Sequence, residues 1–246
     1  IELRDNNEGS GNYQFSILGV RDVLSKEKSN LFSQFSIHTQ EINKDQRYVG
    51  NLGLGYRFLN SDDTFMFGSN VFYDTDIKEG HKRIGYGLEA KAAIVDFSFN
   101  QYLKATNQKV ISGTKEQILS GNEYNLSSQL PYMPWSTFNL QGYRYENEKA
   151  SNDQKGYIYS LENMLNPSLQ FNIELDNSSI SGVKDEHNYE FVFIYPPQEK
   201  EYSLSKQAIS DVAFEKKNMQ AALKDKVRRN NNLTVEIQGS VIFTSK

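Results

Sequence analysis

Apolar and polar residues alternate along most of the first 195 positions. Residues 51–60 read NLGLGYRFLN, and Leu52, Leu54, Tyr56 and Phe58 occupy every second position. The positions between them are small or polar. A period of two residues is typical of a β-strand with two different faces, because successive side chains point to opposite sides. The same alternation recurs in residues 12–19, 31–40, 65–74, 83–91, 169–176 and 188–197.

The connections between these segments also follow a pattern. Short turns such as NSDD alternate with longer polar loops such as VISGTKEQILSGN. Short turns on one rim and longer loops on the other are typical of bacterial outer-membrane barrels. We count about 12 up–down segments, each of roughly 9–11 residues, which is the length of a tilted membrane-spanning strand. The sequence therefore predicts an all-β fold: a 12-stranded antiparallel transmembrane β-barrel formed by residues 1–197.

Some segments fit the alternation less well. These are residues 97–105, 124–132, 138–145 and 157–164. In the third of them, Tyr143 and Tyr145 fall on the face that the pattern marks as polar.

The polar faces carry charges that decide which medium each face meets. Buried in an apolar core, each charge would cost several kcal/mol unless it were paired, whereas a wet lumen tolerates it. We therefore expect the apolar faces to meet lipid, with Phe171 and Ile173 near the bilayer midplane. In the alternative, a soluble sugar-binding β-domain, the charges face bulk water and the aromatic residues share a core. The charges assigned to the lumen are those of Arg57, Arg83, Glu89, Lys91, Glu174 and Glu190.

Composition narrows the function. The mean hydropathy is −0.65 and no run of 18 apolar residues occurs, which excludes a transmembrane helix but not a barrel, because half of each barrel strand is polar. The net charge of −4 gives no basis for nucleic-acid binding. Cysteine is absent, and His38, His81 and His187 lack metal-ligand spacing. We expect no metal, no cofactor and no catalytic residue, so the protein is not expected to be an enzyme.

The pattern changes after Pro196 and Pro197, which cannot donate to a strand ladder. Residues 205–227 lack alternation and fit helical spacing loosely, so we expect a helix in the polar pore, within a second unit formed by residues 198–246. Residues 228–237 are expected to continue as an extended linker toward the outer mouth. Arg228 and Arg229 are expected to reach wall carboxylates, with Glu89 and Glu174 as candidates.

The three asparagines after this pair, Asn230, Asn231 and Asn232, carry both donors and acceptors. We expect them to serve an extended backbone that has no sheet partner of its own.

Four motifs occur in the order of a known family. They are NLGLGYRF at residues 51–58, GSNVFYDTD at 68–76, RIGYGLEA at 83–90 and DKVRRNNNLTVEI at 225–237. Together they resemble the β-barrel translocator of the intimin/invasin family, the inverse autotransporters, and the resemblance extends over essentially the whole chain.

The resemblance implies a barrel in the bacterial outer membrane with a periplasmic N-terminus and a C-terminus directed toward the cell exterior. It implies four kinds of partner: outer-membrane lipid, the barrel-assembly machinery, periplasmic chaperones and the protein's own C-terminal passenger. We expect an anchor and translocator of type V secretion that displays this adhesin. A diffusive porin or substrate channel is the alternative, and residues 201–246 discriminate, because a porin is expected to end at its last strand.

Overall fold

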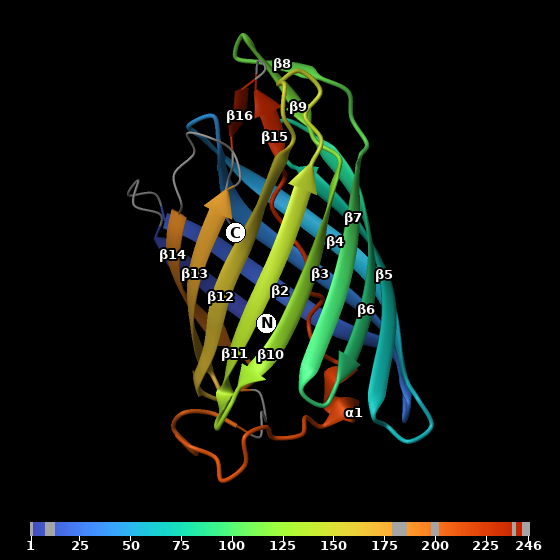
Figure 1. Ribbon diagram of the computed structural model, residues 1–246. Coiled ribbons are helices and arrows are strands. Elements are labelled where there is room, and N and C mark those ends of the chain that lie inside the picture. The colour runs from blue at the N-terminus through green and yellow to red at the C-terminus, as the bar shows by residue number, and fades with distance from the viewer. Residues whose placement is uncertain (1, 8–12, 179–185, 198–201, 238–239, 243–246) are drawn as a thin grey trace.

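The computed structural model describes residues 2–7, 13–178, 186–197, 202–237 and 240–242. Within these residues, 12 antiparallel strands form a closed barrel with the order β1-β14-β13-β12-β11-β10-β7-β6-β5-β4-β3-β2 (Figure 1). This confirms the all-β, antiparallel class. The barrel strands are β1 (Glu2–Asn7), β2 (Tyr13–Lys26), β3 (Ser29–Ile42), β4 (Asp45–Leu59), β5 (Phe65–Asp76), β6 (Lys82–Ala92), β7 (Val95–Lys104), β10 (Gly121–Leu130), β11 (Met133–Tyr145), β12 (Gln154–Asn166), β13 (Leu169–Ser178) and β14 (Glu186–Ile194).

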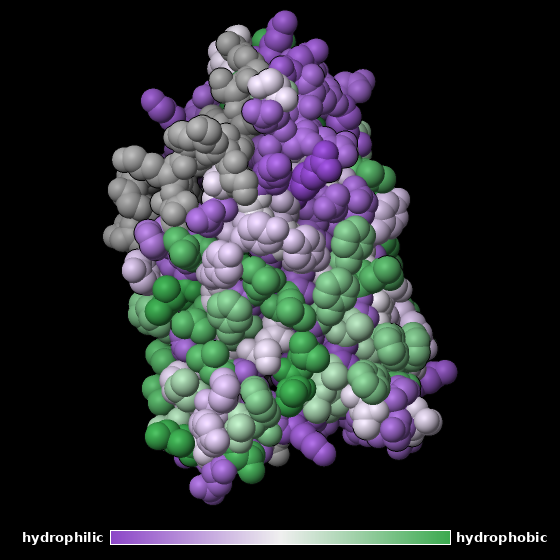
Figure 2. Space-filling view, in the orientation of Figure 1, coloured by the Kyte–Doolittle hydropathy of each residue, from purple (hydrophilic) through white to green (hydrophobic). Residues whose placement is uncertain are grey.

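Strand β4 shows how the alternation divides the two faces. Leu52 and Leu54 are 59% and 53% exposed on the outer surface, whereas Gly53 and Arg57 are buried inside the barrel. Outside, the apolar side chains form a broad band over the lower part of the molecule, and hydrophilic residues gather at its upper end (Figure 2). A band of apolar residues around a closed barrel suits contact with lipid hydrocarbon.

The two rims differ. At the short-turn rim, connections of two to five residues join β2 to β3, β4 to β5, β6 to β7, β10 to β11 and β12 to β13. The opposite, long-loop rim carries a hairpin of β8 (Lys109–Ile111) and β9 (Thr114–Ile118) above the barrel. No helix among the described residues is long and apolar enough to cross a membrane.

The chain returns through the barrel after its last strand. The segment turns at the short-turn rim, rises through the lumen and reaches the long-loop rim, where β15 (Val235–Ile237) and β16 (Ser240–Ile242) join β9 in a small sheet (Figure 1). The expectation that the linker has no sheet partner is therefore wrong for residues 235–237. We call residues 219–237 the plug segment.

The expectation of a helix over residues 205–227 is also wrong. Helix α1 spans only Met219–Ala222, and the side chain of Asn218 caps its first N–H groups. Upstream of α1 the backbone bonds to the short-turn rim: Ser210 N–H donates to the Tyr132 carbonyl, and Tyr132 N–H donates to the Ala213 carbonyl, both at 2.8 Å. These long-range bonds take the backbone groups that a helix would pair within itself. Residues 198–201, 238–239 and 243–246 of the expected second unit lie outside the described residues.

Candidate functional site in the barrel lumen

Side chains of the barrel wall bond the backbone of the plug segment along its length. Amide side chains supply both donors and acceptors for these bonds, because an amide carries both kinds of group. Gln40 pairs with Leu233 through both groups: its Nε2 donates to the carbonyl at 2.8 Å and its Oε1 accepts from the N–H at 2.9 Å. The other amide contacts are Asn30 to the Leu223 carbonyl, Gln34 to the Val227 N–H, Asn51 to the Asn231 carbonyl and Asn100 to the Arg228 carbonyl.

A four-charge cluster holds the middle of the plug segment. Asp74 on β5 accepts from Arg229 at 2.9 and 2.6 Å and from Arg83 Nε at 2.8 Å. Arg83 also donates to the Asn230 carbonyl at 2.8 Å. Glu123 on β10 accepts from the Asn230 N–H at 2.8 Å. Since two carboxylates face two guanidiniums and all are buried, the cluster balances its charge without bulk water.

Two aromatic rings of the wall each lie between a guanidinium in the lumen and a glycine of β4. Arg229 stacks on Phe72 with its Cζ 4.2 Å from the ring centroid. A Cβ built on Gly53 would lie 2.4 Å from the other side of this ring. Arg57 stacks on Phe32 at 4.3 Å in the same way, and Gly55 lies behind that ring. The inward glycines of NLGLGYRF are therefore required by close contact with rings.

The lower plug segment is held by a second cluster. Arg57 forms a bidentate ion pair with Glu89, with contacts of 2.9 and 3.2 Å. It also donates to the backbone carbonyls of Leu223 and Asp225. Lys91 Nζ lies 2.8 Å from the Asp225 carboxylate. Three of the expected lumen charges thus lie inside the barrel at the point where the plug segment leaves α1.

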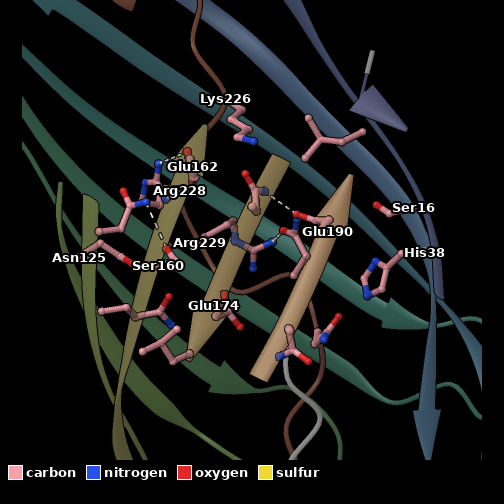
Figure 3. Close-up of a pocket in the computed structure, with 18 of the residues that line it drawn as sticks. Ser16, His38, Asn125, Ser160, Glu162, Glu174, Glu190, Lys226, Arg228 and Arg229 are labelled. Atoms are coloured by element: carbon pink, nitrogen blue, oxygen red, sulfur yellow. Dashed lines mark hydrogen bonds and ion pairs between the residues drawn. The ribbon is translucent and has the colours of Figure 1, made fainter. Parts of the chain in front are cut away.

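Glu174 and Glu190, the two remaining charges that were expected in the lumen, line a cavity of about 130 Å³ beside the plug segment. Figure 3 shows Arg228 beside Glu162, with Glu174 and Glu190 on the neighbouring strands β13 and β14. Arg228 pairs with Glu162 at 2.7 and 3.1 Å, and Glu190 accepts from the side-chain amide of Asn172 at 2.7 Å. The amide contacts to the plug segment come from β3, β4 and β7, whereas Glu162, Glu174 and Glu190 of the cavity lie on β12, β13 and β14.

Both arginines bond to wall carboxylates, as expected, and the carboxylates are those of Glu162 and Asp74. Arg229 bonds to Asp74 rather than to Glu89 or Glu174, and Arg228 bonds to Glu162, which sequence reasoning did not name. Asp74 was visible as an inward position of the alternating segment 65–74. Its pairing with a residue 155 positions away depends on how far the plug segment has advanced through the barrel, which no local pattern encodes.

The asparagine run serves backbone and side chains alike. The Asn230 amide donates to the Tyr145 hydroxyl at 2.9 Å and accepts from the Asn232 N–H at 2.9 Å. Asn231 Oδ1 accepts from Arg229 at 3.0 Å. Tyr145 is one of the two tyrosines that the alternation places on the polar face. It lies fully buried in the lumen, where its hydroxyl has a partner.

At the long-loop rim, β15 pairs with β9, and the side chain of Glu116 on β9 binds Arg47 of the wall with two contacts of 2.7 Å. His81, in the neighbouring loop, is fully buried, and its Nε2 lies 3.6 Å from Glu116. Burial lowers the pKa of His81 below its usual value of 6.5, against the opposing influence of Glu116. Among the described residues, no group of three or more His, Cys, Asp or Glu side chains has the geometry to hold a metal ion.

These features define a class: an antiparallel barrel with an apolar belt, a polar lumen and its own C-terminal segment threaded through it. The family profile described as "Inverse autotransporter, beta-domain" matches residues 2–231, and the chain belongs to this family. The resemblance stated from the four motifs is thereby confirmed.

The curated relatives carry related names. The chain is 33% identical over 107 residues to a putative attaching and effacing protein homolog of Escherichia coli K12, with 42% of this chain and 35% of that protein covered. It is 29% identical to the invasin of Yersinia enterocolitica, covering 49% of this chain and 14% of that protein. It is 26% identical to the inverse autotransporter adhesin YeeJ of Escherichia coli K12, covering 83% of this chain and 9% of that protein. The matched regions thus span about a third or less of these relatives.

Solved structures show the same fold. A chain from work on the in-meso crystallization of membrane proteins superposes with a TM-score of 0.76 at 21% identity, covering 96% of this chain and 99% of that one. The KdgM porin in complex with disordered oligogalacturonate superposes with a TM-score of 0.55 at 8% identity, covering 79% and 98%. At these identities the likeness concerns the fold of the barrel.

Proposed function

We propose that the barrel anchors a C-terminal passenger in the bacterial outer membrane, carries it to the cell surface and then retains residues 219–237 as a plug. The observation that carries the proposal is the row of wall side chains bonded to the plug backbone, from Asn30 to Gln40 and Asn100. Backbone groups are the same in every polypeptide. A lumen that bonds them accepts an extended chain of varied sequence, as export of a long passenger requires.

The path of the chain supports an orientation. Strand β1 begins at the short-turn rim, whereas the plug segment leaves at the long-loop rim. Barrels of the outer-membrane type have short periplasmic turns and longer extracellular loops. The N-terminus then lies in the periplasm, and a passenger after Lys246 emerges outside. The names of the relatives, adhesin and invasin, fit a passenger that binds other cells.

Surface exposure of a C-terminal tag tests this proposal. A folded, epitope-tagged domain is fused after Lys246, and antibody labelling is measured on intact cells. We expect labelling that external protease abolishes, while the barrel stays in the outer-membrane fraction. As a control, the tag is placed in the β4–β5 turn, between Asn60 and Thr64 of the short-turn rim, where intact cells are expected to give no signal. Labelling of the turn tag, or none at the C-terminus, would show that the barrel does not export in this direction.

A further inference from the structure

The chain leaving the barrel enters a second binding site, built by two loops of the long-loop rim. Strand β15 pairs with β9 in the register Val235 to Ile118, Glu236 to Gln117 and Ile237 to Glu116. The N–H of Leu119 extends this ladder to the Thr234 carbonyl at 3.0 Å. We call β9 together with residues 148–150 of the β11–β12 loop the exit clamp.

The β11–β12 loop binds the carboxylate of Glu236. Glu236 is buried, and its two oxygens accept from three consecutive backbone N–H groups. The distances are 3.0 Å from Glu148, 2.9 and 3.2 Å from Lys149, and 2.6 Å from Ala150. Successive N–H groups that converge in this way form an anion-binding concavity, and bonds to an ionised acceptor are stronger than neutral ones.

The opposite face of β15 is apolar. Val235 and Ile237 join a buried cluster with Ile118 of β9 and with Ile42 and Val49 of the barrel wall. The exit clamp therefore fits an extended segment of the pattern apolar–acidic–apolar, with the acid on one side and the apolar pair on the other.

The clamp is itself tied to the barrel. Glu116, the β9 residue opposite Ile237, receives both contacts of the buried Arg47 guanidinium on β4. Arg47 also contacts Asp76 at the end of β5, at 3.3 Å. The hairpin is thus held to β4 directly and to β5 through Arg47, as well as through its own ends.

From this geometry we infer that the exit clamp is a mechanical anchor, which takes up tension on the passenger before that tension reaches the lumen. The inference rests on the proposed function, since only an exported passenger would be pulled. The lower end of β9, at Ile118, continues into β10 of the barrel, whereas the upper end of β15, at Ile237, leads to the C-terminus. Force on an antiparallel pair held at opposite ends acts along the strands. It therefore loads all their hydrogen bonds together rather than one after another. Strand β16 pairs with the other edge of β15, and its last residue, Ile242, lies opposite Val235. A pull on the C-terminus therefore opens the bonds between β15 and β16 one after another from this end, so β16 separates before the clamp is loaded.

Single-molecule pulling tests the clamp on the full chain in a supported bilayer, with a handle attached after Lys246. At constant force we expect two lengthening steps after β16 peels: release of the clamp, then extraction of the plug segment. Glu236→Ala removes the buried carboxylate and is expected to shorten the lifetime of the clamp step about tenfold or more. Lys149→Pro removes one donor and is expected to shorten it as well, whereas Lys149→Ala keeps the N–H and is expected to leave it unchanged.

Val110→Ala is the matched control on the same loop sheet, because Val110 is 68% exposed on β8 and outside the clamp. Bilayer conductance of each variant reports whether the plug is still seated. A clamp lifetime that Glu236→Ala leaves unchanged, with normal conductance, would overturn the anchor. If the proposed function failed instead, the fused tag of the unsubstituted chain would be missing from the surface, which is a separate readout.

Discussion

Arg229 and Asp74 join the plug segment to the barrel wall through two hydrogen bonds, at 2.9 and 2.6 Å, with both side chains almost completely buried. The pair fixes how far the chain has advanced, because Arg229 meets Asp74 only when residues 230–237 have already passed toward the long-loop rim. The stack of Arg229 on Phe72 fixes the direction from which the guanidinium approaches. The buried ion pair, rather than a long helix, therefore marks the position of the chain in the lumen, since α1 spans only Met219–Ala222.

Asp74→Asn is expected to loosen the plug strongly. Removing one member of a buried ion pair typically costs about 3–5 kcal/mol, because the partner charge stays buried, and here both Arg83 and Arg229 lose their acceptor charge. We expect frequent openings in planar-bilayer recordings. Asp153→Asn is the control, since it breaks the exposed pair with Arg144, and such pairs contribute about 0–1 kcal/mol. Equal opening in the two variants would show that Asp74 does not hold the plug.

Gly53→Ala is expected to disturb the lumen, although it adds only a methyl group. Its Cβ would lie 2.4 Å from the Phe72 ring, so the ring must move away from Arg229, at a cost of about 1–3 kcal/mol. Gly50→Ala on the same strand has 3.7 Å to its nearest neighbour and is expected to be neutral. Chemical denaturation of both variants in lipid vesicles measures the difference. Adding Phe72→Leu is expected to rescue Gly53→Ala; failure of this rescue would remove the ring from the explanation.

Arginine substitutions on β13 test which face meets lipid. Ile173 is exposed on the outer surface, whereas the side chain of Asn172 donates to Glu190 inside the lumen. Ile173→Arg is expected to cost about 2–4 kcal/mol of folding into lipid, the usual value for arginine near the bilayer midplane. Asn172→Arg is expected to cost far less, since it meets the lumen carboxylates. Reversible unfolding in vesicles measures both, and similar costs would mean that the outer face does not contact hydrocarbon.

The packing of the long-loop rim is expected to weaken in acid. The pKa of His81 lies below 6.5 in the folded protein because burial disfavours the charged ring. His81 therefore binds a proton at a higher pH in the unfolded chain than in the folded protein. Stability from this residue is therefore full above pH 6.5 and falls as the pH drops from there toward the folded pKa. Hydrogen exchange of β9 at pH 7.0 and 5.5 measures the effect.

His81→Gln separates this effect from other titrations at the rim. Glu116, Asp76, Arg47 and Lys109 act on His81 and stay unchanged in this variant. We expect His81→Gln to reduce the acid-induced increase in exchange of β9. An identical increase in variant and parent would assign the pH dependence to the carboxylates instead.

The alternation of apolar and polar residues predicted the two faces of a strand such as β4, because a period of two residues is a local property of the sequence. It also foretold that Arg57 and Glu89 lie in the lumen, although not that they pair, since pairing requires the register of β4 with β5 and β6. The position of Tyr145 on the polar face could not be explained from the sequence, because its partner is distant in the chain. In the closed barrel its hydroxyl accepts a hydrogen bond from the side chain of Asn230. The expected helix failed for the same kind of reason. Its residues bond to a distant rim and wall, and these contacts outweigh a weak local helical tendency.

Deleting residues 201–246 is the most direct test of the plug. The deletion removes the chain that crosses the lumen but leaves every barrel strand, since β14 ends at Ile194. We expect the conductance in planar bilayers to rise at least severalfold, because the wall amides and the Asp74 cluster would face water instead of the plug backbone. Deleting only residues 240–246 is the matched control, since it spares the plug segment and its clamp on β9, and it is expected to leave the conductance low. A truncated barrel that conducts no more than the full chain would mean that the segment does not close the lumen.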